Sequence, residues 1–423
     1  MLLSLLLPVA FALTLDEAWR LAETDGDDAA LIERQMGAAT TIRGQAAAAL
    51  LPKLSITGGY TVNQYESTID FSKMIPEELA DFVGDSEPIV VNKKSFWSGS
   101  ATVVQPLFSG SAIPAWTAAN AQARAAEAQA DASLDQLRVG VAGAYWGAFL
   151  SRERVRLATD NVARAEKYLT LAETRERVGA GRGIDTAQAG VALARARREL
   201  VQAESGRVQA EEGLSRLLGT EPGVALERPT PRDVRLTSSD AAVDNALEAP
   251  AITAAEERAK AARAARTATD LGWVPTVSGR FTESFSENSG FSGEEWAWQA
   301  AITADWVLFD GGYRIAKQRE AAMNKYVAAH ALDRDRDQAE ADARSLYASL
   351  GAAKEAQGLA VQERALSEKA LTLAEASYEL GALTFLDLWQ TRQQRDGAEM
   401  AELSADMQLD LAAITLIAKT GGW

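Results

Sequence analysis

Two short turns each place glycine where a helical segment ends and carry an aspartate near the start of the next segment. The first turn runs from Val178 to Asp185, and the second runs from Leu380 to Asp387. Glycine ends a helix readily, and an aspartate at the start of the next helix meets free N–H groups and the positive end of the helix dipole. Asp185 and Asp387 therefore fit two roles, as helix caps or as carboxylates with a function of their own.

The composition excludes most kinds of catalytic site. The chain of 423 residues has no cysteine and a single histidine, His330. Thiolate metal sites, disulfides and cysteine nucleophiles are therefore excluded, and we expect no metal and no other cofactor. The net charge of −16 argues against nucleic acid as a partner, because phosphate binding needs clustered Lys and Arg. We expect no enzymatic activity, since neither a phosphate-binding loop nor a concave pair of carboxylates is evident.

Long helices must hold the two turns in place. Residues 115–178 and 313–379 each run for more than 60 positions without proline, which is roughly 95–100 Å of α-helix. Shorter helical segments are predicted at 28–51, 184–218 and 251–272. Residues at heptad spacing predict left-handed coiled-coil packing of the long segments. These stripes are Val155, Ala158, Val162, Ala165, Leu169 and Ala172 in the first segment, and Ala356, Leu359, Glu363, Leu366, Ala370 and Leu373 in the second.

The same order of motifs occurs twice along the chain. Residues 107–110 (Leu-Phe-Ser-Gly) match residues 308–311 (Leu-Phe-Asp-Gly) at an offset of 201 residues. Repetition over such a length indicates that a whole structural unit was duplicated. It predicts two structural repeats, 13–218 and 240–423, joined by a proline-containing equatorial linker at 219–239. Further matched pairs are Trp146 with Tyr347, Asp185 with Asp387, Gln188 with Gln390 and Gly219 with Gly421.

Each repeat also contains one predicted β-hairpin, at about 53–108 and 275–309. Polar and apolar residues alternate along Lys53–Asn63, as in a strand with one apolar and one polar face. In the last strand, Trp298 and Trp306 lie eight residues apart, roughly 19 Å along the membrane normal for a tilted strand. Tryptophan favours membrane interfaces because an apolar ring carries a donor N–H. We therefore predict membrane-interface positions for Trp97, Trp296, Trp298 and Trp306.

Four strands are too few to close a transmembrane barrel. An open sheet edge in lipid leaves N–H and C=O groups unpaired at several kcal/mol each. Two chains would give eight strands with a filled interior, whereas three chains give twelve strands and a lumen. The predicted fold is thus mixed α and β, mostly α, with a long antiparallel α-helical coiled-coil barrel and a shared twelve-stranded β-barrel in a homotrimer. A soluble β-sandwich is the alternative for strands that alternate in this way.

Residues 1–12 have the pattern of a secretory signal peptide. The stretch from Leu2 to Phe11 is almost wholly apolar, and Ala10 and Ala12 form an Ala-x-Ala cleavage site before Leu13. The stretch is too short to cross a bilayer as a helix, which needs ~20 apolar residues. We therefore expect this leader to direct export and then to be removed.

The leader, the duplicated helix–hairpin–helix unit and the Gly-to-Asp turns together resemble the TolC-like outer membrane efflux proteins. The resemblance covers roughly residues 13–422. It implies a homotrimer in the outer membrane of a Gram-negative bacterium, with a periplasmic helical tunnel and contacts to outer membrane lipid. Such a channel is the exit duct of an efflux pump or a type I secretion system. Its implied partners are a periplasmic adaptor (membrane fusion) protein and an inner-membrane RND or ABC transporter.

The resemblance also implies a gate at the periplasmic end of the tunnel. Asp387 matches the first inward-facing gate carboxylate, whereas Gln390 replaces a second one. Tyr378 and Asp185 match a hydrogen-bonding latch pair, but Leu383 stands where an arginine usually completes the latch. These departures predict a weaker latch and a weaker ring of negative charge where three copies bring their gate carboxylates together. The residues implied to lie in adaptor-docking turns are Gly179, Gly181, Gly183, Gly381 and Leu383.

A different class of protein also fits the helices. A periplasmic coiled-coil adaptor or scaffold without a pore would show the same heptad stripes. It would dissolve without detergent as a monomer or dimer, whereas the channel would be found as a trimer in the outer-membrane fraction. The heptads alone favour neither alternative.

Overall fold

A computed structural model describes residues 12–70, 88–234, 236–289, 293–380 and 382–422. The predicted signal peptide lies outside these residues except for Ala12. The chain forms two compact units. The helical unit comprises residues 1–38, 125–256 and 331–423, and the sheet unit comprises residues 39–124 and 257–330.

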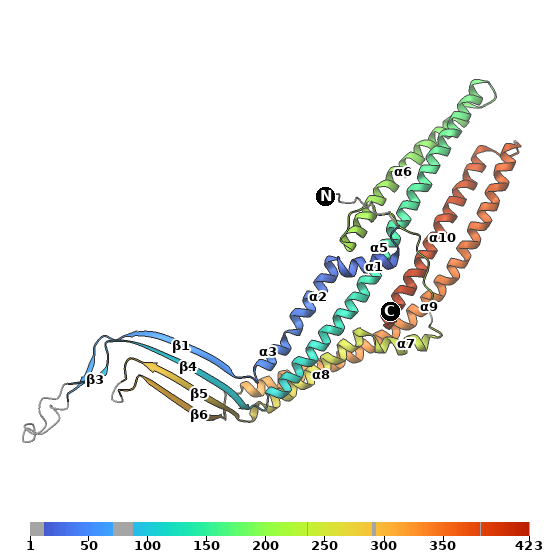
Figure 1. Cartoon of the computed structure of the whole chain (residues 1–423). Helices are drawn as coiled ribbons and strands as arrows, with labels where there is room; N and C mark the ends of the chain where they lie inside the picture. Colours follow the sequence, from blue (N-terminus) through green and yellow to red (C-terminus); the bar gives the residue numbers. More distant parts are fainter. Residues whose placement is uncertain (1–11, 71–87, 235, 290–292, 381, 423) are drawn as a thin grey trace, which may run out of the picture. The chain divides into compact units, whose positions relative to one another are not determined.

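The sheet unit contains a four-stranded antiparallel sheet with the order β1-β4-β5-β6 (Figure 1). Its strands are β1 (Lys53–Val62), β4 (Ser95–Phe108), β5 (Thr276–Ser286) and β6 (Trp296–Asp305). The two hairpins join through β4 and β5, so β1 and β6 are the free edges within one chain. A separate pair, β2 (Ser67–Ile69) and β3 (Ile89–Asn92), lies within the first hairpin.

The strand register separates apolar from polar side chains. Phe281 of β5 lies opposite Val103 of β4 and Ala300 of β6, so these three residues share one face. On the other face, the hydroxyl oxygens of Thr102 and Thr282 lie 3.1 Å apart. Residues directly opposite in an antiparallel pair point to the same side of the sheet. The alternation predicted from the sequence is therefore confirmed as one apolar face and one polar face.

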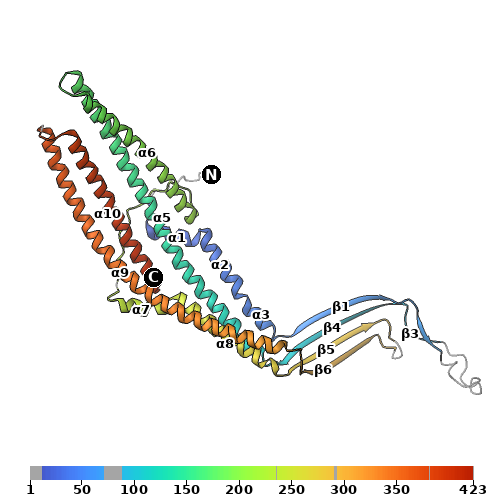
Figure 2. The same ribbon diagram turned by 180° about the vertical axis from the view of Figure 1, so that it is seen from behind.

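Two antiparallel helix pairs dominate the helical unit. α5 (Ala112–Arg177) is followed by α6 (Gly183–Leu218), and α9 (Tyr313–Glu379) is followed by α10 (Phe385–Thr420). In both views α6 lies along α5 and α10 lies along α9 (Figure 2). The long helices α5 and α9 contribute to both units. Within the described residues, no helix combines the length and the apolar character needed to cross a bilayer.

The two predicted heptad stripes have different surroundings. Ala165 of α5 is buried together with Leu193 and Ala196 of α6. The leucines of the α9 stripe, in contrast, are largely exposed. Their exposed fractions are 59% for Leu359, 68% for Leu366 and 61% for Leu373. The stripe on α5 is therefore partly covered within the chain, whereas the leucines of the α9 stripe are exposed.

Buried polar contacts fix the linker to the middle of the helices. The fully buried carboxylate of Asp410 on α10 accepts hydrogen bonds from the Trp146 indole N–H (2.7 Å) and from the Arg232 backbone N–H (2.9 Å). The helices α1 (Leu15–Thr24) and α7 (Ser239–Glu248) pack in the same unit. The Arg232 guanidinium lies over the Trp19 ring of α1, with its Cζ atom 4.3 Å from the ring centroid.

The lead-in helices differ in part from the predicted ones. The segment predicted as one helix over 28–51 forms α2 (Asp27–Thr40) and α3 (Ile42–Ala48), with a break at Thr41. Two successive β-branched threonines have low helix propensity, and nearby glycines lower it further. The second lead-in helix, α8 (Pro250–Asp270), ends in a short 3-10 turn at Leu271–Trp273.

Candidate functional site

The turn between α5 and α6 is shaped by glycine. Gly179 has a φ of +76°, a conformation that side chains with a Cβ rarely adopt. A Cβ added to Gly181 would lie 2.8 Å from the backbone nitrogen of Glu176, which is too close. Gly183 begins α6. The predicted adaptor-docking glycines of this turn therefore have a conformational role that their sequence spacing already suggested.

Asp185 forms its contacts locally, in the first turn of α6. Its carboxylate accepts hydrogen bonds from Arg182 Nε at 3.1 Å and Nη2 at 3.0 Å. These hydrogen bonds from Arg182 hold the pKa of the Asp185 carboxyl below its usual value. Asp185 and Tyr378, the proposed latch pair, both lie in the described part of the chain, and no hydrogen bond joins them there. A latch between these two residues stays a prediction.

The turn between α9 and α10 is capped by threonine. The Thr384 hydroxyl oxygen accepts a hydrogen bond from the Asp387 backbone N–H at 3.2 Å, and the hydroxyl donates to the Asp387 carboxylate at 2.6 Å. Asp387 thus belongs to the N-terminal cap of α10, as one of its two predicted roles required. Both Asp387 and Gln390 are exposed in the chain. Gly381 lies outside the described residues.

Tyr378 and Leu383 pack into an apolar cluster beside this turn. Both residues contact the buried group of Leu371, Ala374 and Leu388. The Tyr378 ring also stands edge-on to the ring of Tyr168 on α5, with centroids 6.4 Å apart. Aromatic pairs in this geometry favour close packing. Leu383, which replaces the expected latch arginine, therefore contributes apolar contact at this turn.

Tyr168 connects α5 to the second helix pair near the turns. Its ring lies 4.5 Å from that of Phe385 and 6.3 Å from that of Trp389, both on α10. Burial raises the pKa of the Tyr168 hydroxyl, which favours its neutral form. We name Tyr168, Tyr378, Phe385 and Trp389 the aromatic cluster. It holds α5 against the second helix pair just before the turns.

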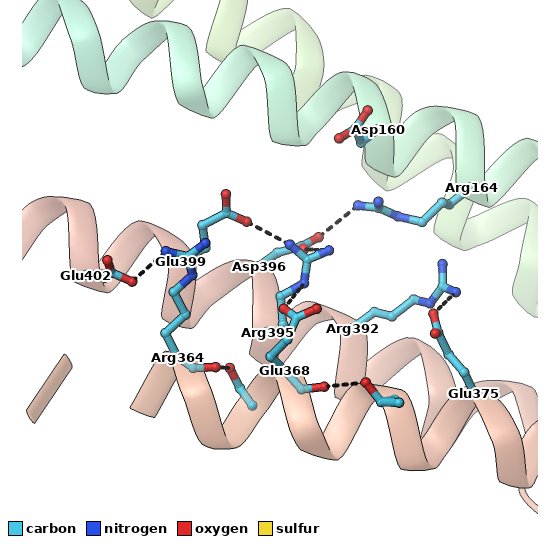
Figure 3. Close-up of polar contacts among 12 residues, drawn as sticks. Asp160, Arg164, Arg364, Glu368, Glu375, Arg392, Arg395, Asp396, Glu399 and Glu402 are labelled. Carbon is cyan, nitrogen blue, oxygen red and sulfur yellow. Dashed lines mark hydrogen bonds and ion pairs between the residues drawn. The ribbon is translucent and has the colours of Figure 1, made fainter. Parts of the chain in front are cut away.

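Beyond the aromatic cluster, a network of arginines and carboxylates joins α5, α9 and α10 (Figure 3). Arg164 reaches from α5 to the Asp396 carboxylate on α10, with Nη2 and Oδ2 3.0 Å apart. Arg395 donates to Glu399 at 2.7 Å, and Arg392 pairs with Glu375 of α9. Ion pairs of this kind link neighbouring helices in a specific register.

Asp396 is the buried centre of this network. Its exposed fraction is 6%, and burial raises the pKa of its carboxyl, an effect that Arg164 and Arg395 oppose. These residues were not predicted from the sequence. A signal was available, because Arg395 and Asp396 each lie three or four residues from both Arg392 and Glu399, a spacing that places charges on one helix face. A solvated face has the same spacing, so burial was not predictable from it.

The predicted interface tryptophans lie in the sheet unit. Trp97 lies opposite Tyr60, with ring centroids 4.9 Å apart. Trp296 and Trp298 belong to β6 and are exposed in the chain. Trp306 follows the end of β6, and its indole N–H donates to the Trp273 carbonyl oxygen at 3.1 Å. The placement of these rings at a membrane interface remains a prediction.

Comparison with known proteins agrees with this architecture. The model of the outer membrane efflux protein family matches residues 32–220 and 242–422. The chain is 27% identical to Protein CyaE of Bordetella pertussis, over 72% of this chain and 67% of CyaE. It is 27% identical to Outer membrane protein OprJ of Pseudomonas aeruginosa, over 74% of this chain and 65% of OprJ. The crystal structure of the Campylobacter jejuni CmeC outer membrane channel shares the fold, with a TM-score of 0.79 at 15% identity over 96% of this chain and 85% of CmeC. The chain belongs to the outer membrane efflux protein family.

Proposed function

We propose that three copies of this chain form the outer-membrane exit duct of a tripartite efflux pump or of a type I secretion system. The observation that carries this proposal is the four-stranded sheet with two free edges, β1 and β6. One face of the sheet is apolar and the other is polar, as lipid outside and water inside would require. Because free edges are costly in lipid, β1 of one copy pairs with β6 of the next.

The helices give independent support to assembly from several copies. Leu359, Leu366 and Leu373 form an exposed apolar stripe at heptad spacing on α9. Such a stripe is stabilised by a second helix that covers it. Helices of neighbouring copies would close the helical tunnel by covering this stripe. The two repeats, 13–218 and 240–423, would then alternate around the tunnel, with the 219–239 linker at its equator.

The proposed partners follow from the exit-duct role. The α5–α6 and α9–α10 turns would dock a periplasmic adaptor protein, and that adaptor would connect the duct to an inner-membrane RND or ABC transporter. The match to the outer membrane efflux protein family supports a role in transport for this chain.

A bilayer experiment tests the channel directly. Protein extracted from the outer-membrane fraction should migrate as a heat-modifiable trimer. It should also produce discrete ion-conductance steps in planar bilayers, whereas the boiled sample should produce none. A product that stays in the soluble periplasmic fraction as a monomer or dimer, without conductance, would instead support the pore-free scaffold.

The gate proposal has its own test at Tyr378. We expect Tyr378→Phe to raise single-channel conductance, because it removes the hydroxyl needed for a latch with Asp185. The ring contact with Tyr168 is kept, so the local fold should persist. Phe385→Leu, which alters the same aromatic cluster without touching the latch hydroxyl, is the control. Unchanged conductance in Tyr378→Phe would count against the latch.

A further inference from the structure

Two cationic side chains lie in one cross-strand row of the sheet. In the register, Lys53 of β1 lies opposite Val104 of β4, and Val104 lies opposite Arg280 of β5. The row ends with Ala301 of β6. Adjacent strands are about 4.8 Å apart, so the backbones at Lys53 and Arg280 are separated by roughly 10 Å. Both side chains are exposed.

The polar face of the sheet is the face that carries both cations. Arg280 is two residues from Ser278 and from Thr282 on the same strand, so all three point to the same side. The hydroxyls of Ser278 and Thr303 lie 3.0 Å apart across β5 and β6, and those of Thr102 and Thr282 lie 3.1 Å apart across β4 and β5. In a barrel of the proposed kind, this hydroxyl-rich face lines the water-filled lumen.

Little negative charge opposes these cations on the same face. Among the described residues of the four strands, the acidic side chains are Glu283 and Asp305. Glu283 lies opposite Ala101 and Trp298, which places it on the apolar face. Asp305 shares the polar face but pairs with Thr276 at the strand end, about 13 Å along the sheet from the row of Arg280. Neither Lys53 nor Arg280 makes an ion pair within the described part of the chain.

We infer that Lys53 and Arg280 form a ring of positive charge around the lumen of the β-barrel and favour the passage of anionic solutes through this section. The inference rests on the proposed trimeric channel, in which two cations per chain become six around one lumen. A ring of like charges concentrates counter-ions and repels ions of its own sign. The inferred cargo preference is for anionic over cationic solutes of the same size.

Ion selectivity of single channels in planar bilayers tests this inference. The reversal potential under a KCl gradient gives the ratio of K⁺ to Cl⁻ permeability. In dilute salt, we expect the double variant Lys53→Gln/Arg280→Gln to raise this ratio at least about twofold. The difference should shrink toward 1 M KCl, where the Debye length is about 3 Å. Glu283→Gln is the matched control, because it removes a charge from the same strand on the opposite face and should leave the ratio at its wild-type value.

A second version of the experiment changes the charge at position 280 reversibly, by chemical labelling of an introduced thiol. It is possible because the chain has no cysteine of its own. Arg280→Cys introduces the single thiol, which a thiosulfonate reagent can label in an already assembled channel. A reagent that adds an ammonium group should restore the wild-type ratio, and one that adds a sulfonate should raise the ratio further. Two results would overturn the inference while leaving the channel intact. One is a wild-type permeability ratio in the double variant at low salt, and the other is an Arg280→Cys channel whose permeability ratio neither reagent changes. A wild-type protein that forms no conducting trimer would overturn the proposed function itself.

Discussion

At the residue scale, the helical unit relies on a few polar side chains removed from water. The Asp396 carboxylate forms ion pairs with Arg164 and Arg395. The Asp410 carboxylate accepts hydrogen bonds from the Trp146 indole N–H and from the Arg232 backbone N–H in the linker. A buried charge is tolerated only when its partners replace the water that it loses. These residues therefore fix how the two helix pairs and the linker meet, and single substitutions at them should have large effects.

Replacing Asp396 with alanine tests the buried network. We expect Asp396→Ala to destabilise the protein by about 3 kcal/mol, because it leaves the Arg164 and Arg395 guanidinium groups without their shared carboxylate. Asp160→Ala is the control, since Asp160 pairs with Arg156 at 3.6 Å and both side chains are about half exposed. The control should cost less than about 1 kcal/mol. Thermal denaturation of the detergent-solubilised protein measures both, and equal losses would contradict a buried role for Asp396.

Tyr145 provides a pH-dependent contribution to stability. Its buried hydroxyl donates to the carbonyl oxygens of Leu13 and Glu227, and burial raises the pKa of Tyr145 to about 12. An unperturbed tyrosine has a pKa of about 10. The folded state thus favours the neutral hydroxyl, and the resulting stabilisation is complete below pH 10 and is lost between about pH 10 and 12.

Comparison with Tyr145→Phe isolates this contribution. At pH 8, we expect the variant to be less stable by about 1–2 kcal/mol, because the hydrogen bonds of the buried hydroxyl to the Leu13 and Glu227 carbonyl oxygens are lost. The difference between wild type and variant should narrow as the pH rises from 10 to 12. Denaturation temperatures measured across this range give the difference at each pH. A gap that stays constant to pH 12 would show that Tyr145 has the same pKa in the folded and the unfolded protein, so that folding does not raise it.

At the element scale, α6 and α10 end in the same way. Gly219 caps α6 with a φ of +66°, and Gly421 caps α10 with a φ of +65°. These two glycines are matched in the duplicated sequence, so the sequence repeat corresponds to a repeat of backbone conformation. Their surroundings differ, however. A Cβ on Gly219 would lie 2.6 Å from the Asp25 carbonyl oxygen, whereas a Cβ on Gly421 would meet nothing closer than 3.6 Å.

This difference predicts unequal costs for the same substitution. Gly421→Ala should cost about 1 kcal/mol, the strain of a left-handed backbone with a Cβ. Gly219→Ala should cost at least about 1 kcal/mol more, because the backbone of Asp25 must also move. Thermal denaturation of the two variants under identical detergent conditions gives the comparison. Equal costs would mean that the α1–α2 connection yields without strain.

The strands and the long helices were predictable from the periodicity of the sequence, whereas the hydrogen-bonding partners of individual side chains were not. The alternation along Lys53–Asn63 and the long proline-free segments identify the strands and helices, because burial of one face imposes a period on the sequence. The break at Thr41 and the helix α1 were not predicted, since both depend on weak local preferences that tertiary packing can override. At the candidate site, the sequence located the turns around Asp185 and Asp387. Arg182 and Thr384, which bind these carboxylates, were not identified, because several polar residues nearby had equivalent spacing.

At the scale of the whole molecule, the fold of one chain is incomplete as a membrane structure. Its sheet ends at β1 and β6, and its α9 leucine stripe is exposed. Both features would be satisfied by further copies of the same chain arranged about one axis, in which the same two surfaces recur at every junction. The hydrophobic stripe and the sheet edges belong to different units of the chain, so they support assembly independently.

The proposed junction between sheet edges predicts a specific cross-link. Within one chain, β1 and β6 are separated by β4 and β5, a span of about 14 Å. Between neighbouring copies, the same two strands would be adjacent. We therefore expect Ile56→Cys/Ala300→Cys, treated with a short thiol cross-linker in the membrane, to give covalent dimers and trimers on denaturing gels. Each single variant should give monomers, because its one thiol has no counterpart on the adjoining strand and the chain has no cysteine of its own. If a double variant that still forms trimers yields only monomers, Ile56 and Ala300 do not meet between copies, which would count against this pairing of β1 with β6.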